Sequence, residues 1–170
     1  MLSKPDACRG CPLYGDGRGF VPDELREDAE ITIVAQNPGE YEELGKRVVD
    51  YGPRYGHRVT YRTEPCTPAP LIGPTGFQLE RDYLPVPRTQ VSLCNILKCR
   101  VQVKRMATGK VERINEMPMG KTLEAAVAHC TRAHLRIPGR TRLVVAMGAH
   151  AVRFFGFPGS VTEWRGFVKP

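Results

Sequence analysis

Three short segments rich in valine, isoleucine and leucine constrain the fold of this chain more than any other feature: residues 31–35, 90–95 and 142–147. Predicted helices separate or follow them, at residues 40–44, 74–84, 121–135 and 149–155. Strands that alternate with helices predict parallel β/α units. Because the strand segments are apolar almost throughout, we expect helices on both faces of the sheet. The sequence therefore predicts an α/β domain.

Two regions interrupt this pattern. Residues 45–70 mix tyrosines and arginines with frequent proline and glycine, which predicts an irregular insert, either a loop or an extended hairpin. Residues 101–120 are basic, and we expect a loop there. The length fits a single domain, residues 1–170. No apolar run is long enough to cross a membrane and no apolar signal segment opens the chain, so we expect a protein inside the cell without a membrane partner.

The charge of the chain points to a polyanionic partner. The formal net charge of +7 favours binding to nucleic acid. Basic side chains are dense between the second predicted strand and the third predicted helix: Lys98, Arg100, Lys104, Arg105, Lys110 and Arg113. We expect the first four of them to contact DNA phosphates, with an affinity that falls as salt rises. A solvated loop without a binding role is the alternative.

Six cysteines in a chain predicted to lie inside the cell favour metal or redox chemistry over disulfides. Cys8 and Cys11 are two residues apart, a spacing that lets two thiolates face one metal centre. Cys99 follows the second predicted strand, and Cys130 lies within the third predicted helix. Thiolates select zinc or iron–sulfur centres, and a chance pair beside unrelated buried cysteines is the remaining alternative. Two cysteines have no predicted ligand role, a loop thiol and a buried strand thiol: Cys66 and Cys94.

Polar and glycine-rich turns stand where a ligand of an α/β sheet is expected, beyond the carboxyl ends of the strands. Residues 36–39 follow the first strand, and their proline stiffens the turn while their glycine lets backbone N–H groups approach a ligand. Asn95 ends the second strand, and its amide can both donate and accept at the edge of an amide-like ring. Residues 71–76 precede a helix, whose N–H groups could hold an anionic or carbonyl oxygen. We expect these three segments to converge on one edge of the sheet.

Motifs along nearly the whole chain resemble the iron–sulfur, or family 4, uracil-DNA glycosylases, in the order found in that family. The matching segments are residues 8–13, 35–43, 70–76, 95–100, 115–118, 147–151 and 165–166. The best match is Asn-Ile-Leu-Lys-Cys-Arg at 95–100, where the family has Asn-Val-Val-Lys-Cys-Arg. The resemblance implies a three-layer α/β/α fold around a parallel four-stranded sheet. The family's last strand and its His-Pro-Ser-type loop would follow residue 170, so we expect a truncated chain or a domain of a longer protein.

The resemblance also implies a role for each matched position. Four cysteines would hold a [4Fe–4S] cluster, with zinc as the alternative: Cys8, Cys11, Cys99 and Cys130. The implied catalytic positions hold the sugar, the attacking water and the uracil edge: Gln36, Asn37 and Asn95. Further contacts to the substrate would come from Pro38, Gly39, Leu71 and Gly73. Arg165 would contact the DNA.

The implied activity is hydrolysis of the N-glycosidic bond of uracil in DNA, as in base excision repair. Asn37 can position a water but cannot take its proton, so catalysis would rest on hydrogen bonds to the departing uracil after the base is flipped out. Two positions differ from the family. Gln36 replaces a glutamate, and Leu71 replaces a phenylalanine that stacks on the base, for which Tyr61 is a candidate substitute.

These differences keep a second function open, that of a catalytically inactive [4Fe–4S] DNA-binding domain in a larger replication or repair protein. Similar modules occur fused to phage-type DNA polymerases, so a covalently linked or downstream polymerase domain is an expected partner. The resemblance implies the cytoplasm of a bacterial or phage-infected cell. A zinc-bound structural domain without a role in nucleic-acid binding is a third alternative.

Overall fold

The computed structural model describes residues 2–15, 17–55, 57–101, 103–107, 110–114, 120–157 and 162–163. Its centre is a parallel sheet with the strand order β5-β2-β9. These strands are β2 (Ile31–Ala35), β5 (Val91–Asn95) and β9 (Leu143–Ala146), which confirms the predicted parallel α/β arrangement. Within the described residues the sheet has three strands, whereas the resemblance implies four.

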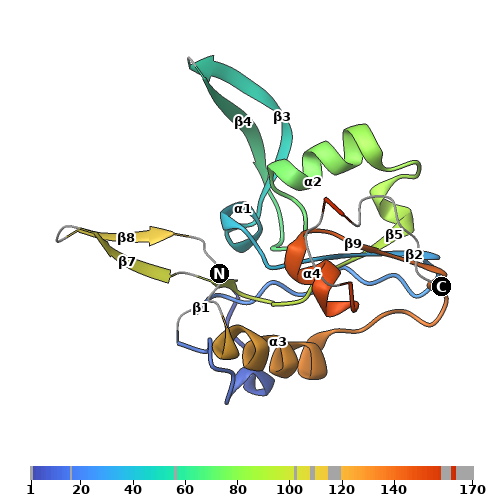
Figure 1. Cartoon of the computed structure of the whole chain (residues 1–170). Helices are drawn as coiled ribbons and strands as arrows, with labels where there is room; N and C mark the ends of the chain where they lie inside the picture. The colour runs from blue at the N-terminus through green and yellow to red at the C-terminus, as the bar shows by residue number, and fades with distance from the viewer. Residues whose placement is uncertain are drawn as a thin grey trace.

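Helical segments cover both faces of this sheet (Figure 1). The face that carries Ile33 and Leu93 packs against Leu79, in the π-helical turn η2 (Leu79–Tyr83) that continues α2 (Pro74–Gln78). The opposite face carries Val34 and Cys94 and packs against α3 (Lys121–His134) and α4 (Ala149–Phe154). Successive strand residues point to opposite faces, so two apolar layers form. The result is the expected three-layer α/β/α fold.

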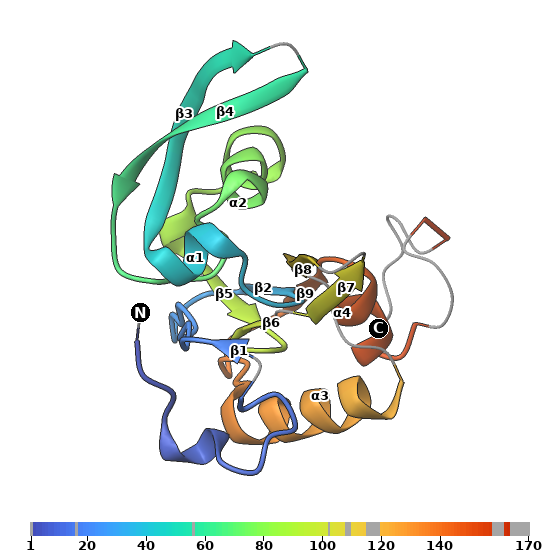
Figure 2. The same cartoon turned by 90° about the vertical axis from the view of Figure 1, so that its left-hand side faces the viewer.

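Several short helical turns and strands lie outside the central sheet. They are a 3-10 turn η1 (Asp6–Cys8), the helix α1 (Glu40–Leu44), a 3-10 turn η3 (Arg88–Gln90), and the strands β1 (Gly17–Arg18) and β6 (Arg100–Val101). The antiparallel pairing of β1 with β6 brings the N-terminal segment beside the chain that leaves the end of β5. In Figure 2 this N-terminal segment lies against α3, below the sheet.

Two hairpins project from the body of the protein (Figure 1). The first pairs β3 (Lys46–Tyr55) with β4 (Arg58–Pro65) and has two irregularities in its register. It is the extended hairpin that the sequence left open as an alternative to a loop. The second pairs β7 (Val103–Ala107) with β8 (Lys110–Ile114), so the prediction of a basic loop at 101–120 is wrong for these residues. Valine and isoleucine recur among the basic residues of this segment and favour strands. No helix in the described part of the chain is long and apolar enough to span a bilayer.

Candidate functional site

The N-terminal turn brings two cysteines together. Cys8 ends η1, and the backbone N–H of Cys11 donates to the carbonyl oxygen of Cys8 at 3.1 Å. Gly10, between them, has a φ of +86°, a left-handed conformation that suits glycine. Leu13 packs with Leu97 and with Ala126 of α3 and anchors this turn beside the end of β5.

Four cysteines from three parts of the chain line one pocket. Cys8 and Cys11 come from the N-terminal turn, Cys99 from the segment after β5, and Cys130 from α3. Leucine, aromatic and histidine side chains complete the lining together with two lysines: Leu13, Leu97, Tyr14, Phe20, His129, His134, Lys4 and Lys98. The structure thus brings together the four cysteines that the sequence singled out, while Cys66 is exposed elsewhere.

Burial favours the neutral form of three of these thiols, those of Cys8, Cys99 and Cys130. It raises the pKa of Cys99 to about 12 and that of Cys130 to about 11. It also raises the pKa of Cys8, and the neighbouring Cys11 adds to this effect. A metal centre binds thiolates, so its binding must displace these protons. These four thiols could therefore hold a metal centre whose binding depends on pH.

Asn95 ends β5 as a buried amide. Its residue is 1 % exposed, and its backbone N–H donates to Oδ1 of Asp23 at 3.2 Å. The side-chain Nδ2 has no hydrogen-bond partner among the described residues. A buried donor without a partner is costly, which is why such atoms are rare in folded proteins. The amide of Asn95 is therefore suited to donate to a bound ligand.

The turn at 36–39 lies beside Asn95, as predicted. Ala35 of β2 pairs in register with Asn95, so both strands end at the same edge of the sheet. Asn37 donates from Nδ2 to the carbonyl oxygen of Pro38 at 3.0 Å, and Pro38 is almost completely buried. The side chain of Gln36 turns toward α4, where Oε1 accepts the backbone N–H of His150 at 3.0 Å. This link between Gln36 and α4 was not predicted.

Glu42 joins the two glycine-containing turns. Its carboxylate accepts the N–H of Gly39 at Oε2 (3.0 Å) and the N–H of Gly73 at Oε1 (3.2 Å). The residue is only 8 % exposed and sits in the first turn of α1. A glutamate three residues after the residue that caps a helix is a known capping pattern, and this signal could have identified Glu42 from the sequence. The turns at 36–39 and 70–76 therefore have a fixed relative position.

Leu71 has an unusual backbone conformation, with a φ of +54°. Arg88, a buried residue, donates to the carbonyl oxygens of Leu71 (2.8 Å) and Pro70 (2.5 Å). The side chain of Leu71 packs in the core with Ile33 and Leu79, so it does not replace the exposed stacking ring of the family. The sequence carries no local signal for this role of Arg88, because its partners lie 17 and 18 residues away.

The predicted DNA contact of Lys98 is wrong. Its residue is 2 % exposed, and Nζ donates to Asp23 at 2.5 and 2.7 Å. The run of buried residues in β5 continues through Lys98, so the ammonium group points inward and finds a carboxylate there. Arg100 also lies mostly out of solvent, and its guanidinium pairs with Glu43 at 3.3 Å and Glu40 at 3.6 Å.

The other predicted DNA contacts stay predictions. Lys104 and Arg105 lie in β7, where the structure describes the backbone and not the side chains. Arg165 lies outside the described residues.

Fold and candidate site together define an α/β protein with polar side chains and two glycine-containing turns at the carboxyl ends of its strands, and with a cysteine-lined pocket beyond β5. No protein-family model matches the chain. A type-4 uracil-DNA glycosylase of Thermotoga maritima is 29% identical over 161 residues, which cover 94% of this chain and 67% of that protein. This similarity over nearly the whole chain supports the resemblance to the superfamily of the family 4 uracil-DNA glycosylases.

Proposed function

We propose that this protein hydrolyses the N-glycosidic bond between uracil and deoxyribose in DNA. The observation that carries the proposal is the amide of Asn95, which is buried at the end of β5 and whose Nδ2 has no partner within the described residues. This donor would bind a carbonyl oxygen of a flipped uracil. Negative charge grows on that oxygen as the glycosidic bond breaks, so the hydrogen bond strengthens in the transition state.

The other residues of the site would position the sugar and the water. Asn37 donates from Nδ2 to the carbonyl of Pro38, so its amide oxygen is the atom that can accept a hydrogen bond from water. The amide oxygen of Gln36 is engaged by α4, and the carboxylate of Glu42 is engaged by two backbone N–H groups. Neither side chain is placed to take a proton from water. The reaction would therefore depend on stabilisation of the departing base rather than on a general base in the 36–39 turn.

We also propose that Cys8, Cys11, Cys99 and Cys130 hold a [4Fe–4S] cluster. Soft thiolates in a pocket lined by leucine and aromatic side chains suit iron–sulfur ligation. A single zinc ion needs donors within about 2.3 Å of one point. Among the described residues, no group of three or more His, Cys, Asp or Glu side chains is arranged to hold one metal ion. A [4Fe–4S] cluster takes four cysteine thiolates, and the four cysteines of the pocket would supply them. When bound, it would join the N-terminal turn, the segment after β5 and α3.

A second function is favoured by the placement of Gln36 and Leu71. Gln36 is turned toward α4 and Leu71 is packed in the core, so two positions that act on the substrate in the family are used for structure. The chain would then be an inactive [4Fe–4S] DNA-binding domain of a larger replication or repair protein, with a linked polymerase domain as partner.

The two functions are distinguished with oligonucleotides that carry one uracil or one thymine at the same position. The cluster-loaded protein is incubated with each, and abasic sites are cleaved with alkali. We expect strand cleavage for the uracil substrate, none for thymine, and none with Asn95→Ala. Binding of the uracil substrate without cleavage would support the inactive domain. Absence of both binding and cleavage would exclude both functions.

A further inference from the structure

Lys98 lies between the two parts of the site. Its side chain lines the cysteine pocket, and its Nζ donates to the backbone carbonyl oxygen of Asn95 at 2.5 Å. The same ammonium group binds both carboxylate oxygens of Asp23, and Oδ1 of Asp23 accepts the backbone N–H of Asn95 at 3.2 Å. Both backbone polar groups of Asn95 are therefore held by one ion pair.

This ion pair is almost completely removed from water, with side-chain exposures of 2% for Lys98 and 6% for Asp23. Burial raises the pKa of the Asp23 carboxyl more than Lys98 lowers it. The loss of hydration of a buried pair offsets much of its attraction, so such a pair adds little to stability compared with apolar residues of the same size. Its hydrogen bonds to Asn95 indicate a role in placing that residue instead.

We propose that Asp23 and Lys98 are positioning residues that fix Asn95 for recognition of the base and that Lys98 also balances the negative charge of the thiolate-bound centre. The inference rests on the proposed function, which gives Asn95 its ligand. A recognition group must be held within a fraction of an ångström of its working position. Because Lys98 precedes Cys99 and lines the same pocket, its side chain connects the cysteine pocket with Asn95.

The experiment compares Lys98→Met, Lys98→Arg and Asp23→Asn with the wild-type protein. Lys121→Met, a change at an exposed lysine at the start of α3, is the matched control. Two quantities are measured on cluster-loaded protein. One is the preference for DNA that contains a non-hydrolysable uracil nucleotide over the same DNA with thymine. The other is the reduction potential of the cluster.

We expect Lys98→Met to reduce the preference for uracil by roughly tenfold or more, since a misplaced donor loses a hydrogen bond to the base. Its reduction potential should become more negative, because a nearby cation favours the added electron. Lys98→Arg should leave the reduction potential near the wild-type value, because the positive charge is kept. It should still lower the preference for uracil, because the guanidinium group differs in shape from the ammonium group. Asp23→Asn should lower the preference, and Lys121→Met should leave both quantities unchanged.

An unchanged uracil preference in Lys98→Met would overturn the positioning role, and an unchanged potential would overturn the charge role. A wild-type protein that shows no preference for uracil would instead overturn the proposed function. In that case the potential of Lys98→Met still tests whether this ammonium acts on the cluster.

A separate surface carries a second inference. The ring centroids of Tyr51 and Tyr61, both in the β3–β4 hairpin, are 5.9 Å apart. The ring centroids of Tyr51 and Phe77, a residue of α2, are 5.4 Å apart. The guanidinium of Arg81 lies 4.9 Å from the ring centre of Tyr51. Tyr51 is 40 % exposed. One exposed ring, two partly buried rings and one guanidinium therefore cluster where the hairpin meets α2.

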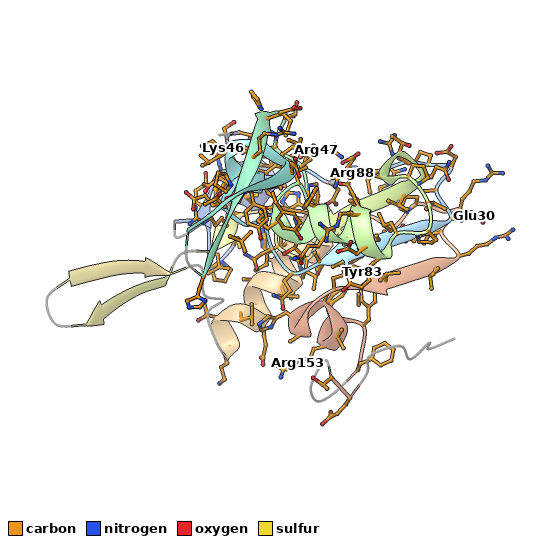
Figure 3. All side chains as sticks on the ribbon, turned by 90° about the horizontal axis from the view of Figure 1, so that it is seen from above. Glu30, Lys46, Arg47, Tyr83, Arg88 and Arg153 are labelled. Carbon is orange, nitrogen blue, oxygen red and sulfur yellow. The ribbon has the colours of Figure 1, made fainter. Side chains whose placement is uncertain are left out.

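The charge of the hairpin complements a nucleic acid. Five basic residues of 46–65 outnumber two acidic ones: Lys46, Arg47, Arg54, Arg58 and Arg62 against Asp50 and Glu64. Figure 3 labels Lys46 and Arg47 at the base of this hairpin. Exposed rings beside a basic strand are the means by which proteins hold unpaired bases and follow the phosphate backbone. We infer that this hairpin binds single-stranded DNA next to the site.

The test measures fluorescence anisotropy of a labelled single-stranded oligonucleotide without uracil. Tyr51→Leu keeps an apolar side chain against Phe77 but removes the aromatic face, and Tyr83→Leu is the control. Tyr83 is 76 % exposed and lies apart from Lys46 and Arg47 in Figure 3. We expect Tyr51→Leu to weaken binding roughly fivefold or more, and Tyr83→Leu to leave it unchanged. Equal affinities for the two variants would overturn the inference.

Discussion

The side-chain oxygen Oε1 of Gln36 accepts the backbone N–H of His150 at 3.0 Å and so binds the end of β2 to the start of α4. Without this acceptor, one N–H in the first turn of α4 loses its partner. We expect Gln36→Ala to lower the free energy of unfolding by about 1 kcal/mol, as loss of a helix cap does. Gln36→Glu should retain most of the stability, because a carboxylate can accept the same bond and is favoured near a helix N-terminus. Urea denaturation measures both variants, and equal stability of Gln36→Ala and wild type would contradict this role.

Glu42 gives a prediction about the two turns that it joins. Glu42→Ala leaves the N–H groups of Gly39 and Gly73 without their acceptor, so we expect a loss of about 2 kcal/mol or more in the free energy of unfolding. Glu42→Gln keeps one acceptor oxygen and should lose less. The control is Glu40→Ala, a change at a side chain that is 62% exposed, and we expect a change within about 0.5 kcal/mol. Similar losses for Glu40→Ala and Glu42→Ala would show that Glu42 does not hold the turns.

The central sheet could be predicted because its signal is local. Residues 31–35 are β-rich and apolar and end at a proline–glycine turn, and they coincide with β2. Since parallel strands end at a common edge, the meeting of Asn95 with the turn at 36–39 follows from the same pattern. The resemblance to a family predicted that the four cysteines act together. Their spacing alone left three interpretations open: an iron–sulfur centre, a zinc site, or a chance pair beside unrelated buried cysteines.

The distant hydrogen-bond partners of Lys98 and Gln36 could not be predicted in this way. Lys98 reads as one of a run of basic residues, yet its carboxylate partner Asp23 lies 75 residues earlier. Gln36 reads as part of a ligand-binding turn, and its partner His150 lies 114 residues later. No local pattern encodes such pairs, because they depend on which segments the fold brings together. The sequence predicts the β3–β4 hairpin only as an alternative to a loop, because two irregularities in register interrupt the regular pattern of its strands.

Arg88 allows a comparison of a buried ion pair with an exposed one on the same glutamate. Arg88 binds Glu80 at 3.0 Å and Glu24 at 2.7 Å, and its side chain is 6% exposed. Arg47 also binds Glu80, at 2.7 Å, with a side chain that is 41% exposed. We expect Arg88→Met to cost about 2 kcal/mol or more, because it removes the buried donor of two carbonyl groups and one cationic partner from each of two carboxylates. Arg47→Met should cost about 1 kcal/mol or less. Thermal and urea unfolding test this, and equal costs would contradict it.

The cysteine pocket predicts which thiols are needed for iron. After anaerobic reconstitution, Cys99→Ser and Cys130→Ser should lose most of the bound iron and inorganic sulfide, because each removes one lining thiolate. Cys66→Ser should keep the wild-type content, since Cys66 is exposed outside the pocket. Cys94→Ser is a stricter control: Cys94 is buried in β5, so its loss should lower stability but leave the iron content unchanged. Equal iron content in all four variants would show that the pocket does not bind the cluster.

His150 predicts a dependence of stability on pH. Burial, together with the neighbouring Arg153, holds the pKa of His150 below its usual value. The unfolded chain therefore binds a proton near pH 6.5, whereas the folded protein binds it only at a lower pH. A fall in pH thus stabilises the unfolded state relative to the folded state. The stabilising contribution is complete above about pH 6.5 and is lost as the pH drops toward the lower, folded-state pKa. We expect the free energy of unfolding to fall less between pH 7 and pH 5 in His150→Asn than in the wild type, when both are followed by urea denaturation. His57→Asn, a change at an exposed histidine, is the control, and a pH dependence in His150→Asn as steep as that of the wild type would contradict the prediction.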